Sequence, residues 1–528
     1  MSALPQTAPE AAETYSYDLV PYESYPYDFT QPQRMAAAGR LFGMSPPDIR
    51  TARVLELGCA GGGNILPLAA RYPDAKFVGV DLSAVQIGQA RDLAAGVGAK
   101  NIEFHHMSIA DVGPEFGSFD YIICHGVFSW VPAPVRDAIF RIFARNLSPR
   151  GLALVSYNTY PGWHQVRAIR DMMNYHCARF ATAAEKVSQG LALLRFVLDG
   201  IHPSQTAYRE VIQKEIELLG NQRASYIFHE HLEETNQPMH LHEVAAMGRR
   251  VGLEYVGDAN LEIMHLNNFP ENVAKTLATA DDIVRIEQYL DFITNRRFRI
   301  SLFCGRENPL KRNLDQGAIL DFHLGSRLSP PAAQVELTRD MRQVFKGQNG
   351  VEVTTENRYA AALLQVLSNM ENRVIDARDA VREGADLVGG GVEAADRVRG
   401  ALVDIGLKMV FAGVLTVHSD SPGVSGAVSA RPVAFAPARE IAKRGGDIVP
   451  SLYHQRISAG PAERALLQAC DGTRDPRALA DYLAERLKLG ELAMQRGGHA
   501  VAEPAAGDID AWIQATLAQF ARVGLLAA

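Results

Sequence analysis

Residues 53–64 read RVLELGCAGGGN, an apolar segment that runs directly into a glycine-rich turn. A second apolar segment, residues 76–80, leads into Asp81, about 20 residues beyond the turn. This order of strand, glycine turn, helix, strand and acid is typical of βαβ units that bind nucleotides. The sequence therefore predicts strands over 53–57 and 76–80, with a helix that starts at Asn64.

Two residues of this segment indicate which nucleotide it binds. A dinucleotide fingerprint needs glycine at the second position of Gly-x-Gly-x-x-Gly, where this chain has Ala60. Glu56 precedes the turn, where a carboxylate would repel a phosphate. An adenosine compound with positive charge and no phosphate fits better, so we expect S-adenosylmethionine, whose sulfonium and ammonium are cationic. A NAD-dependent enzyme is the disfavoured alternative.

The composition excludes several classes of protein. A net charge of −7 gives no general affinity for nucleic acid or acidic membranes. The longest apolar candidate for a membrane span, residues 401–417, contains Asp404 and Lys408, and the N-terminus lacks the features of a signal peptide. The five scattered cysteines form no CxxC pair or zinc spacing. We expect a soluble cytoplasmic protein without a metal; a homodimer is compatible with these observations.

The fold class is predicted from seven apolar segments. Five of these segments alternate with helical patterns. They are the strands over 53–57 and 76–80 named above and three more over 101–105, 119–124 and 151–157. Residues 164–236 are helical in pattern, after which strands follow over 253–259 and 297–304. The last of these alternates polar and apolar residues, which favours an antiparallel strand. We expect an α/β, Rossmann-like, seven-stranded and mostly parallel sheet with a helical insertion.

The remaining sequence predicts further modules. Val351–Thr354 fits one arm of a hairpin, and the last hundred residues give three helical patterns that suggest small helical or winged-helix modules. The predicted organisation has six parts. The first four are an N-terminal segment and lid (1–50), the first five strands (51–163), a helical and regulatory region (164–237) and the rest of the sheet (238–306). A middle module (307–430) and a C-terminal helical module (431–528) follow.

Candidate cofactor residues lie where the predicted strands end, because ligands bind at the carboxyl ends of parallel strands. Asp81 would accept hydrogen bonds from ribose hydroxyls; its alternative role, capping the next helix, already falls to Ser83. Ser108 and Ile109 would contact adenine, unless they are ordinary loop residues. His125 would lie near the methyl donor, although a lone histidine is more often structural.

Candidate catalytic residues follow the fifth strand. Tyr157 and Asn158 would orient a nucleophile, and Trp163 would wall the pocket and attract a cation to its ring. The alternative is a turn with buried aromatic residues. The tyrosine-rich residues 15–29 form either a lid over the site or an irregular surface segment. The histidines and glutamates of residues 229–234 are interpreted as a solvated helix end and not as a metal site.

At the level of family, the chain resembles class I S-adenosylmethionine-dependent methyltransferases, and more narrowly bacterial ones with a methyltransferase regulatory domain. The motifs that carry this resemblance are ELGCAGGGN, VGVDLS, HGVFSWVP, YNTYPGWH, YIFHEHLEETNQP and RRFRISLFCG. The segments RPVAFAPAREIAKRGGDIVPSLYHQ and LLQACDGTRDPRALADYL are similar to the C-terminal region of rickettsial-type protein-lysine methyltransferases.

The resemblance implies a Rossmann-like seven-stranded sheet and methyl transfer from S-adenosylmethionine. Its cofactor positions fall on Glu56, Gly58, Cys59, Gly61, Gly63, Asp81, Ser108, Ile109 and His125. Two residues depart from the family pattern: Ala60 replaces a common glycine, and Gln31 stands where an N-terminal element often carries histidine.

Three hypotheses for the function follow. The first is N-methylation of lysine side chains in a protein substrate. The second is a small-molecule methyltransferase of specialised metabolism, in which the insertion and the N-terminal aromatic residues close over a narrow pocket. The third is a scaffold with a degenerate methyltransferase core, against which the intact glycine turn and Asp81 argue.

Overall fold

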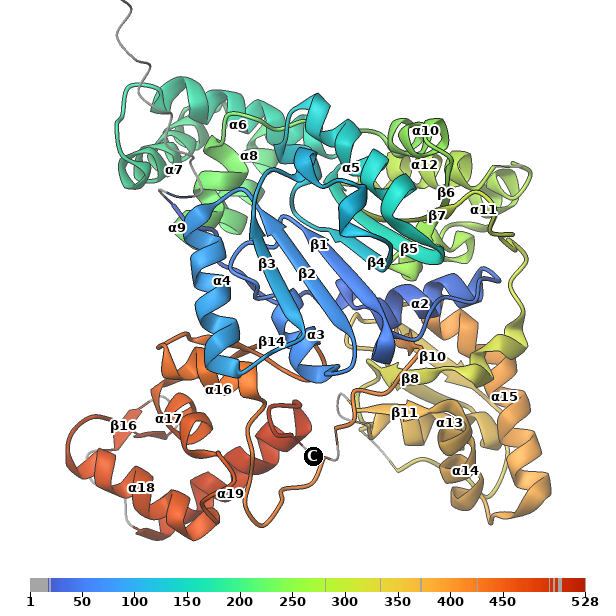
Figure 1. The fold of residues 1–528 in the computed structure, drawn as a ribbon. Helices are drawn as coiled ribbons and strands as arrows, with labels where there is room; N and C mark the ends of the chain where they lie inside the picture. Colours follow the sequence, from blue (N-terminus) through green and yellow to red (C-terminus); the bar gives the residue numbers. More distant parts are fainter. Residues whose placement is uncertain are drawn as a thin grey trace, which may run out of the picture.

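The computed structural model describes residue 18 and residues 20–280, 282–332, 334–370, 373–424, 426–492, 494–496, 499–501 and 506–527. Residues 1–17 and 19 of the predicted N-terminal segment therefore lie outside the described residues. Among the described residues, no helix is long and apolar enough to cross a bilayer. A central sheet carries helices on both faces, and two further modules lie beneath it (Figure 1).

The central sheet has seven strands in the order β3-β2-β1-β4-β5-β7-β6. Strands β1 to β5 are parallel, and β7 runs antiparallel to both β5 and β6, as the sequence predicts. The bounds are β1 (Arg53–Leu57), β2 (Lys76–Asp81), β3 (Ile102–His106), β4 (Phe119–Cys124), β5 (Leu147–Asn158), β6 (Leu253–Asp258) and β7 (Phe298–Gly305).

The predicted start of the fifth strand is wrong. The sequence predicts this strand over 151–157, but β5 begins at Leu147 and so includes Pro149 as well as Gly151. The pairing of β5 with β4 shifts register there, from Phe119 opposite Leu147 to Tyr121 opposite Leu152. The proline and glycine are therefore accommodated by a bulge, a common solution for these residues at a sheet irregularity.

Each face of the sheet buries its own hydrophobic cluster. Val54 and Leu55 of β1 point to opposite faces, because side chains alternate along a strand. The Leu55 face also contains residues of α5 (Ala133–Asn146), α10 (Leu241–Arg250) and α12 (Ile283–Thr294), and the Val54 face those of α2 (Pro32–Leu41), α3 (Ile65–Arg71) and α4 (Ala84–Val97). Burial on both faces explains why β1, β2 and β4 are nearly continuously apolar.

The predicted helical insertion follows β5 and has a hydrophobic core of its own, around Ile169, Met173 and Leu194. It ends in a short π-helix, η6 (Phe228–Leu232), which packs against α6. The insertion helices are α6 (Trp163–Cys177), α7 (Ala183–Gly200), α8 (Thr206–Gly220) and α9 (Ala224–Ile227).

The last two strands are held by a buried ion-pair network. The guanidinium of Arg299 in β7 is inaccessible to solvent and contacts the carboxylates of Glu287 at 2.8 Å and Asp291 at 2.7 Å. It also lies 3.5 Å from Asp258 at the end of β6. These contacts join β6, β7 and α12, because a charge buried away from water needs partners of opposite sign.

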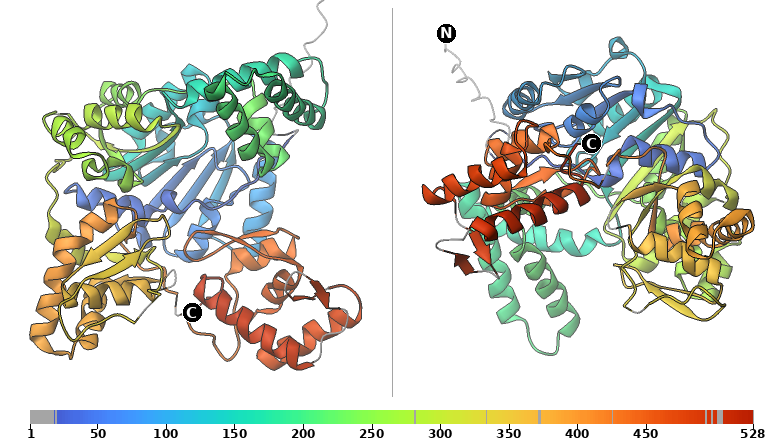
Figure 2. Two further views of the ribbon diagram at one scale, coloured as in Figure 1. Left: turned by 180° about the vertical axis from the view of Figure 1, so that it is seen from behind. Right: turned by 90° about the horizontal axis from the view of Figure 1, so that it is seen from below.

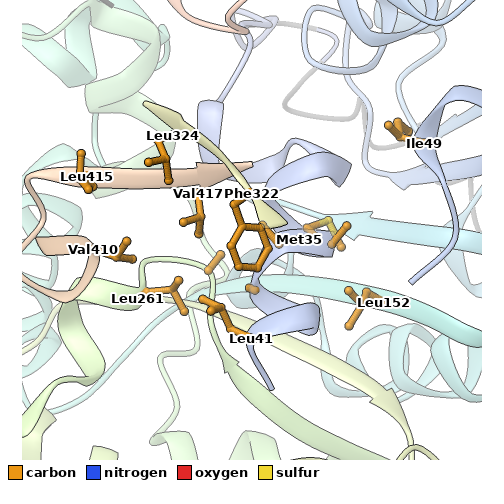
Figure 3. Close-up of a cluster of buried hydrophobic side chains, with 14 of the residues drawn as sticks. Met35, Leu41, Ile49, Leu152, Leu261, Phe322, Leu324, Val410, Leu415 and Val417 are labelled. Atoms are coloured by element: carbon orange, nitrogen blue, oxygen red, sulfur yellow. The ribbon is translucent and has the colours of Figure 1, made fainter. Parts of the chain in front are cut away.

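A middle module shares one hydrophobic cluster with the sheet (Figure 3). Phe322, Leu324 and Val417 pack there with Met35 and Leu41 of α2. The module contains β8 (His323–Ser326), the predicted hairpin β9 (Gln343–Lys346) and β10 (Glu352–Thr355), α13 (Arg358–Ser368), β11 (Val374–Asp376), α14 (Ala377–Leu387), α15 (Gly391–Phe411) and β12 (Leu415–His418).

The C-terminal module lies beside the middle module, and both lie under the sheet in Figure 1 and in the left view of Figure 2. Its helix α16 packs against α3 and α4 of the core. The elements are α16 (Ala436–Lys443), β13 (Ile448–Pro450), β14 (Arg456–Ser458), α17 (Pro461–Ala469), α18 (Pro476–Lys488), β15 (Met494–Arg496), β16 (His499–Val501) and α19 (Ala506–Arg522). Helices with short hairpins agree with the expected winged-helix type.

Candidate functional site

The glycine turn after β1 adopts backbone conformations that are unfavourable for residues with a side chain. Gly58 has φ +75°, and a Cβ there would lie 2.2 Å from Cγ2 of Val127. Ala60 has φ 47°, a left-handed conformation that is uncommon for a residue other than glycine. The backbone N–H groups of Gly58 and Cys59 donate to the Val80 carbonyl, at 2.8 and 3.1 Å, which fixes the turn to the end of β2.

Asp81 holds this strained turn in place. Its Oδ2 accepts a hydrogen bond from the Ala60 N–H at 2.9 Å, and its Oδ1 accepts one from the Ser83 N–H at 2.9 Å. The N-cap of α4 is Ser83, whose Oγ accepts from the Gln86 N–H, as expected. Asp81 is therefore free of the capping role. Burial raises its pKa, against the hydrogen bonds from Ser83 and Ala60.

Glu56 is the most unusual charged group of the turn. Only 3% of the residue is exposed, and its Oε1 accepts a hydrogen bond from Nδ2 of Asn64 at 2.6 Å. Its Oε2 is buried without a hydrogen-bond partner among the described residues. Burial raises the pKa of Glu56 to about 8. A buried acceptor without a partner is costly, so this oxygen fits a cationic or hydrogen-donating ligand group.

Asn64 joins the turn to two distant segments. Its Oδ1 accepts from the backbone N–H of Tyr27 at 3.0 Å and lies 3.0 Å from the Thr30 hydroxyl. It also lies 2.9 Å from Nε2 of His454, a residue of the C-terminal module. Burial lowers the pKa of His454 to about 3, so this ring is neutral at physiological pH and donates through its Nε2–H. One amide therefore connects Glu56, the N-terminal segment and the C-terminal module.

The N-terminal aromatic segment lies directly over the turn, which favours the lid interpretation. Ser24 Oγ accepts a hydrogen bond from the Gly63 N–H at 2.7 Å. The ring of Tyr27 lies 4.2 Å from the ring of His125, and Arg456 of β14 lies 5.3 Å from the Tyr27 ring. We call residues 20–31 the lid. Its contacts show that the C-terminal module packs on the lid as well as on the turn.

His125, at the end of β4, is held in a polar and aromatic environment. Its Nδ1 lies 2.8 Å from the Ser156 hydroxyl, and the rings of Tyr27 and Phe29 contact it edge-on. Burial, followed by the positive charge of Arg456, lowers the pKa of His125 to about 3. The imidazole therefore stays neutral at physiological pH, and it lies on the lid side of the glycine turn.

The other predicted cofactor residues lie at the ends of neighbouring strands. Ser108 caps a short helical turn, where its Oγ accepts from the Ala110 N–H at 3.2 Å, and Ile109 is buried in the cluster that also holds Val80. Cys59 is 2% exposed, and burial raises its pKa well above the usual value of a thiol. Gly61 and Gly63 face Ser24 of the lid. Their role in binding the cofactor stays a prediction.

The three predicted catalytic residues do not lie together. The Tyr157 hydroxyl is 3.0 Å from Ser301 Oγ inside the core, where burial raises its pKa. Trp163 starts α6 and packs edge-on against Trp130, 6.2 Å between ring centroids. Asn158 is buried, and its Nδ2 has no hydrogen-bond partner among the described residues. Of the three, Asn158 offers a donor for a ligand; the catalytic assignment stays a prediction.

The segment 229–234, expected to be a solvated helix end, is exposed at Glu234, but the prediction is wrong for its histidines. His229 and His231 are each 2% exposed. His231 Nε2 lies 3.0 Å from Glu215 Oε1, and His229 Nε2 lies 2.7 Å from the Val20 carbonyl. The packing of the π-helix against α6 and α7 buries them. No group of three or more His, Cys, Asp or Glu in the described part of the chain is arranged to hold a metal.

Glu230 of the same π-helix is a site residue that the sequence did not single out. Burial raises its pKa to about 7, against the nearby Arg170. The pKa of Tyr27 is raised mainly by burial, and Arg456 opposes this effect. The carboxylates of Glu230 and Glu56 make smaller contributions that also raise it, so both charges act on the Tyr27 hydroxyl. Glu230 also raises the pKa of Tyr226. The only signal in the sequence is its place in an acidic, histidine-rich segment.

Substitution of Gly63 tests the contact between the turn and the lid. A Cβ at Gly63 would lie 2.1 Å from the Ser24 carbonyl oxygen, so Gly63→Ala should displace the lid. We expect amide hydrogen exchange in residues 20–31 to become faster by at least about tenfold, since their local opening becomes less costly. Gly88→Ala in α4 is the matched control, because its Cβ meets nothing within 4 Å. Unchanged exchange in Gly63→Ala would contradict the lid contact.

Comparison with known proteins follows the same division of the chain. Three family models match: "Methyltransferase domain" over residues 54–151, "Predicted methyltransferase regulatory domain" over residues 223–305, and "PKMT, C-terminal winged helix domain" over residues 430–525. The third match identifies the C-terminal module as a winged-helix domain, in agreement with its short hairpins.

Two relatives match over nearly the whole chain. The uncharacterized protein RP789 of Rickettsia prowazekii is 38% identical over 500 residues, which cover 93% of this chain and 89% of that protein. The structure of PKMT2 from Rickettsia typhi in complex with AdoHcy is 30% identical, with a TM-score of 0.87, and the match covers 96% of this chain and 100% of that one. The chain thus belongs to the same family of S-adenosylmethionine-dependent methyltransferases as PKMT2.

Proposed function

We propose that this protein transfers the methyl group of S-adenosylmethionine to the side-chain amine of lysine in a protein substrate. The observation that carries the proposal is a pair of carboxyl groups, the buried Glu56 and the partly buried Glu230, whose charges both act on the Tyr27 hydroxyl of the lid. Glu56 lies at the end of β1, directly before the glycine turn, and Glu230 lies in the insertion. Two separate acids suit a reaction in which both donor and acceptor are cations.

The residues of the turn fit the donor. The unpartnered Glu56 Oε2 suits a positively charged group, and Gly58 leaves room where a Cβ would collide. Asp81 keeps spare acceptor capacity for hydroxyl groups, because each of its oxygens accepts one hydrogen bond from the backbone. When bound, S-adenosylmethionine supplies an electrophilic methyl group on its sulfonium. The AdoHcy complex of PKMT2 supports this assignment.

Aromatic and acidic residues of the lid and the insertion fit a lysine side chain. An ammonium is attracted to aromatic faces and to carboxylates, and Tyr27, Tyr226 and Glu230 offer both. A lysine must lose a proton before its nitrogen is nucleophilic, and Glu230, with a pKa of about 7, is matched to accept that proton near neutral pH. His125 is neutral and adds no repelling charge. The chain otherwise contributes proximity and alignment.

The protein acceptor is supported by the winged-helix match, whose description names PKMT, an abbreviation of protein-lysine methyltransferase. The small-molecule alternative is not favoured by the comparisons. A cytoplasmic location and a homodimer stay predictions.

The proposal is tested by incubating the protein with a cell extract and a donor that carries a deuterated methyl group. We expect mass spectrometry to find the label on lysines of one or a few proteins. Asp81→Ala should abolish it, because the variant releases the turn that holds the donor. Label found only on small metabolites would contradict a protein acceptor, and no label at all would contradict the enzymatic proposal.

Ionisation of Glu56 should make donor binding depend on pH. With its pKa near 8, Glu56 is mostly protonated at pH 6, and a cationic donor must displace that proton. The affinity of the wild-type protein relative to Glu56→Gln should therefore rise from pH 6 to pH 8, by up to about tenfold per pH unit. Calorimetry measures both proteins with the same donor. Glu103→Gln, at an exposed carboxylate, should follow the wild type; parallel pH profiles for Glu56→Gln and wild type would refute the role of Glu56.

Removal of the Glu230 carboxylate should slow transfer without loss of donor binding. We expect Glu230→Gln to lower kcat by about 100-fold, the usual contribution of a general base. The loss should be largest above pH 7, where the wild-type group is ionised. Glu234→Gln, an exposed neighbour, is the control and should stay active. A Glu230→Gln enzyme with the wild-type kcat would exclude the proposed proton acceptor.

A further inference from the structure

A cavity of about 120 Å³ lies where three parts of the chain meet. The core contributes side chains from α2 and α3, the middle module from β8 and β12, and the C-terminal module from the loop between β13 and β14. Polar and charged side chains dominate its wall, among them Arg34, Arg71, Arg327, His418, Tyr453 and Gln455. Arg34 lies in α2 and Arg71 in α3, and Arg327 directly follows β8.

The three guanidinium groups differ in whether a nearby carboxylate neutralises their positive charge. Arg34 forms an ion pair with Asp28 at 2.6 Å, and Arg327 forms one with Glu262 at 3.2 Å. Arg71 has no carboxylate within ion-pair distance among the described residues. Asp420 acts on it only at longer range, where it raises the pKa of Arg71 against the larger effect of burial.

Arg71 carries an unused donor at this cavity. Its Nη1 donates to the Leu452 carbonyl at 3.1 Å, and its guanidinium lies 4.7 Å from the ring of Tyr72. Among the described residues, its Nη2 is inaccessible to solvent and has no hydrogen-bond partner, and the same holds for the hydroxyl of Tyr453, another wall residue. A buried donor without a hydrogen-bond partner is costly, so these donors fit an anion.

Basic groups act on the histidine of the cavity wall. His418, on the wall, has a pKa well below the usual value, first because of burial and then because of Arg34, Arg71, His323 and Arg327. The largest charge effects on this ring come from basic groups, and the acidic Asp28 on the same wall is paired with Arg34. Together with the unused donors, these basic groups point to a negatively charged ligand.

The volume limits the size of that ligand. A water molecule takes about 30 Å³ in the liquid, so the cavity has room for a few waters or one tetrahedral oxyanion. It is smaller than the roughly 300 Å³ or more of sites for nucleotide-sized ligands. A phosphate dianion combines the charge, the acceptors and the size that the wall requires.

We propose that this cavity is a binding site for a phosphate-like oxyanion, held by Arg71 and Tyr453 with support from Arg34 and Arg327. The bound anion joins the core, the middle module and the winged-helix domain. Tyr453 precedes His454, the residue that contacts Asn64 of the glycine turn. The site is separate from the methyl-transfer site and does not depend on the assignment of the acceptor.

Inorganic phosphate is the probe that tests the site, on the full chain and at constant ionic strength. We expect phosphate to raise the thermal midpoint saturably, while chloride at the same ionic strength leaves it unchanged, because only a ligand of the folded state stabilises it. Arg71→Gln should weaken phosphate binding by at least about tenfold. Arg50→Gln, at an exposed arginine of the core, is the matched control and should bind as the wild type does.

Stability without phosphate separates a binding role from a structural one. If Arg71 awaits an anion, Arg71→Gln is at least as stable as the wild type in chloride and loses only the gain from phosphate. Equal destabilisation with and without phosphate would overturn the proposal, as would the absence of a saturable effect on the wild type. Arg71→Lys should keep weakened binding. Glycerol phosphate that binds as well as free phosphate would support the site and assign it to phosphorylated metabolites.

Discussion

The side-chain amide of Asn64 is the interaction on which the arrangement of this protein depends. Its nitrogen donates to the buried Glu56, and its oxygen faces Tyr27 of the lid and His454 of the winged-helix domain. Such a network is strong only when every member is present, because each group is buried and has few alternative partners. The turn, the lid and the C-terminal domain are therefore parts of one site.

This arrangement explains why a methyltransferase core carries such large additions. The lid covers the glycine turn, and the insertion contributes Glu230. The winged-helix domain contacts the turn through His454 and the lid through Arg456. Gln31, where the family often carries histidine, donates its amide to the Tyr453 carbonyl at 3.2 Å and so serves the same junction. The C-terminal domain thus has a structural role at the glycine turn and the lid, where we propose that the donor binds.

Local sequence patterns predicted the sheet, the glycine turn and the N-cap at Ser83, because these features depend on neighbouring residues. Local patterns did not predict contacts that depend on packing between segments far apart in the sequence. Asn64 is one polar residue at the start of a helix, and its contact with His454 spans 390 positions. Glu230 was hidden in a segment expected to be solvated, since the helices that bury it are fixed only by the tertiary fold. Tyr157 was correctly placed at a strand end, yet the alternation of the strand directs it into the core.

The most direct test is a double-mutant cycle on donor binding with Asn64→Ala and His454→Gly, where glycine suits the φ of 60° at position 454. Calorimetry gives the binding free energy of each variant. We predict that each single variant weakens binding and that the double variant is little worse than Asn64→Ala alone, since both remove the same network. Additive losses, or a His454→Gly variant that binds the donor as the wild type does, would contradict the claim that the C-terminal domain helps to build the donor site.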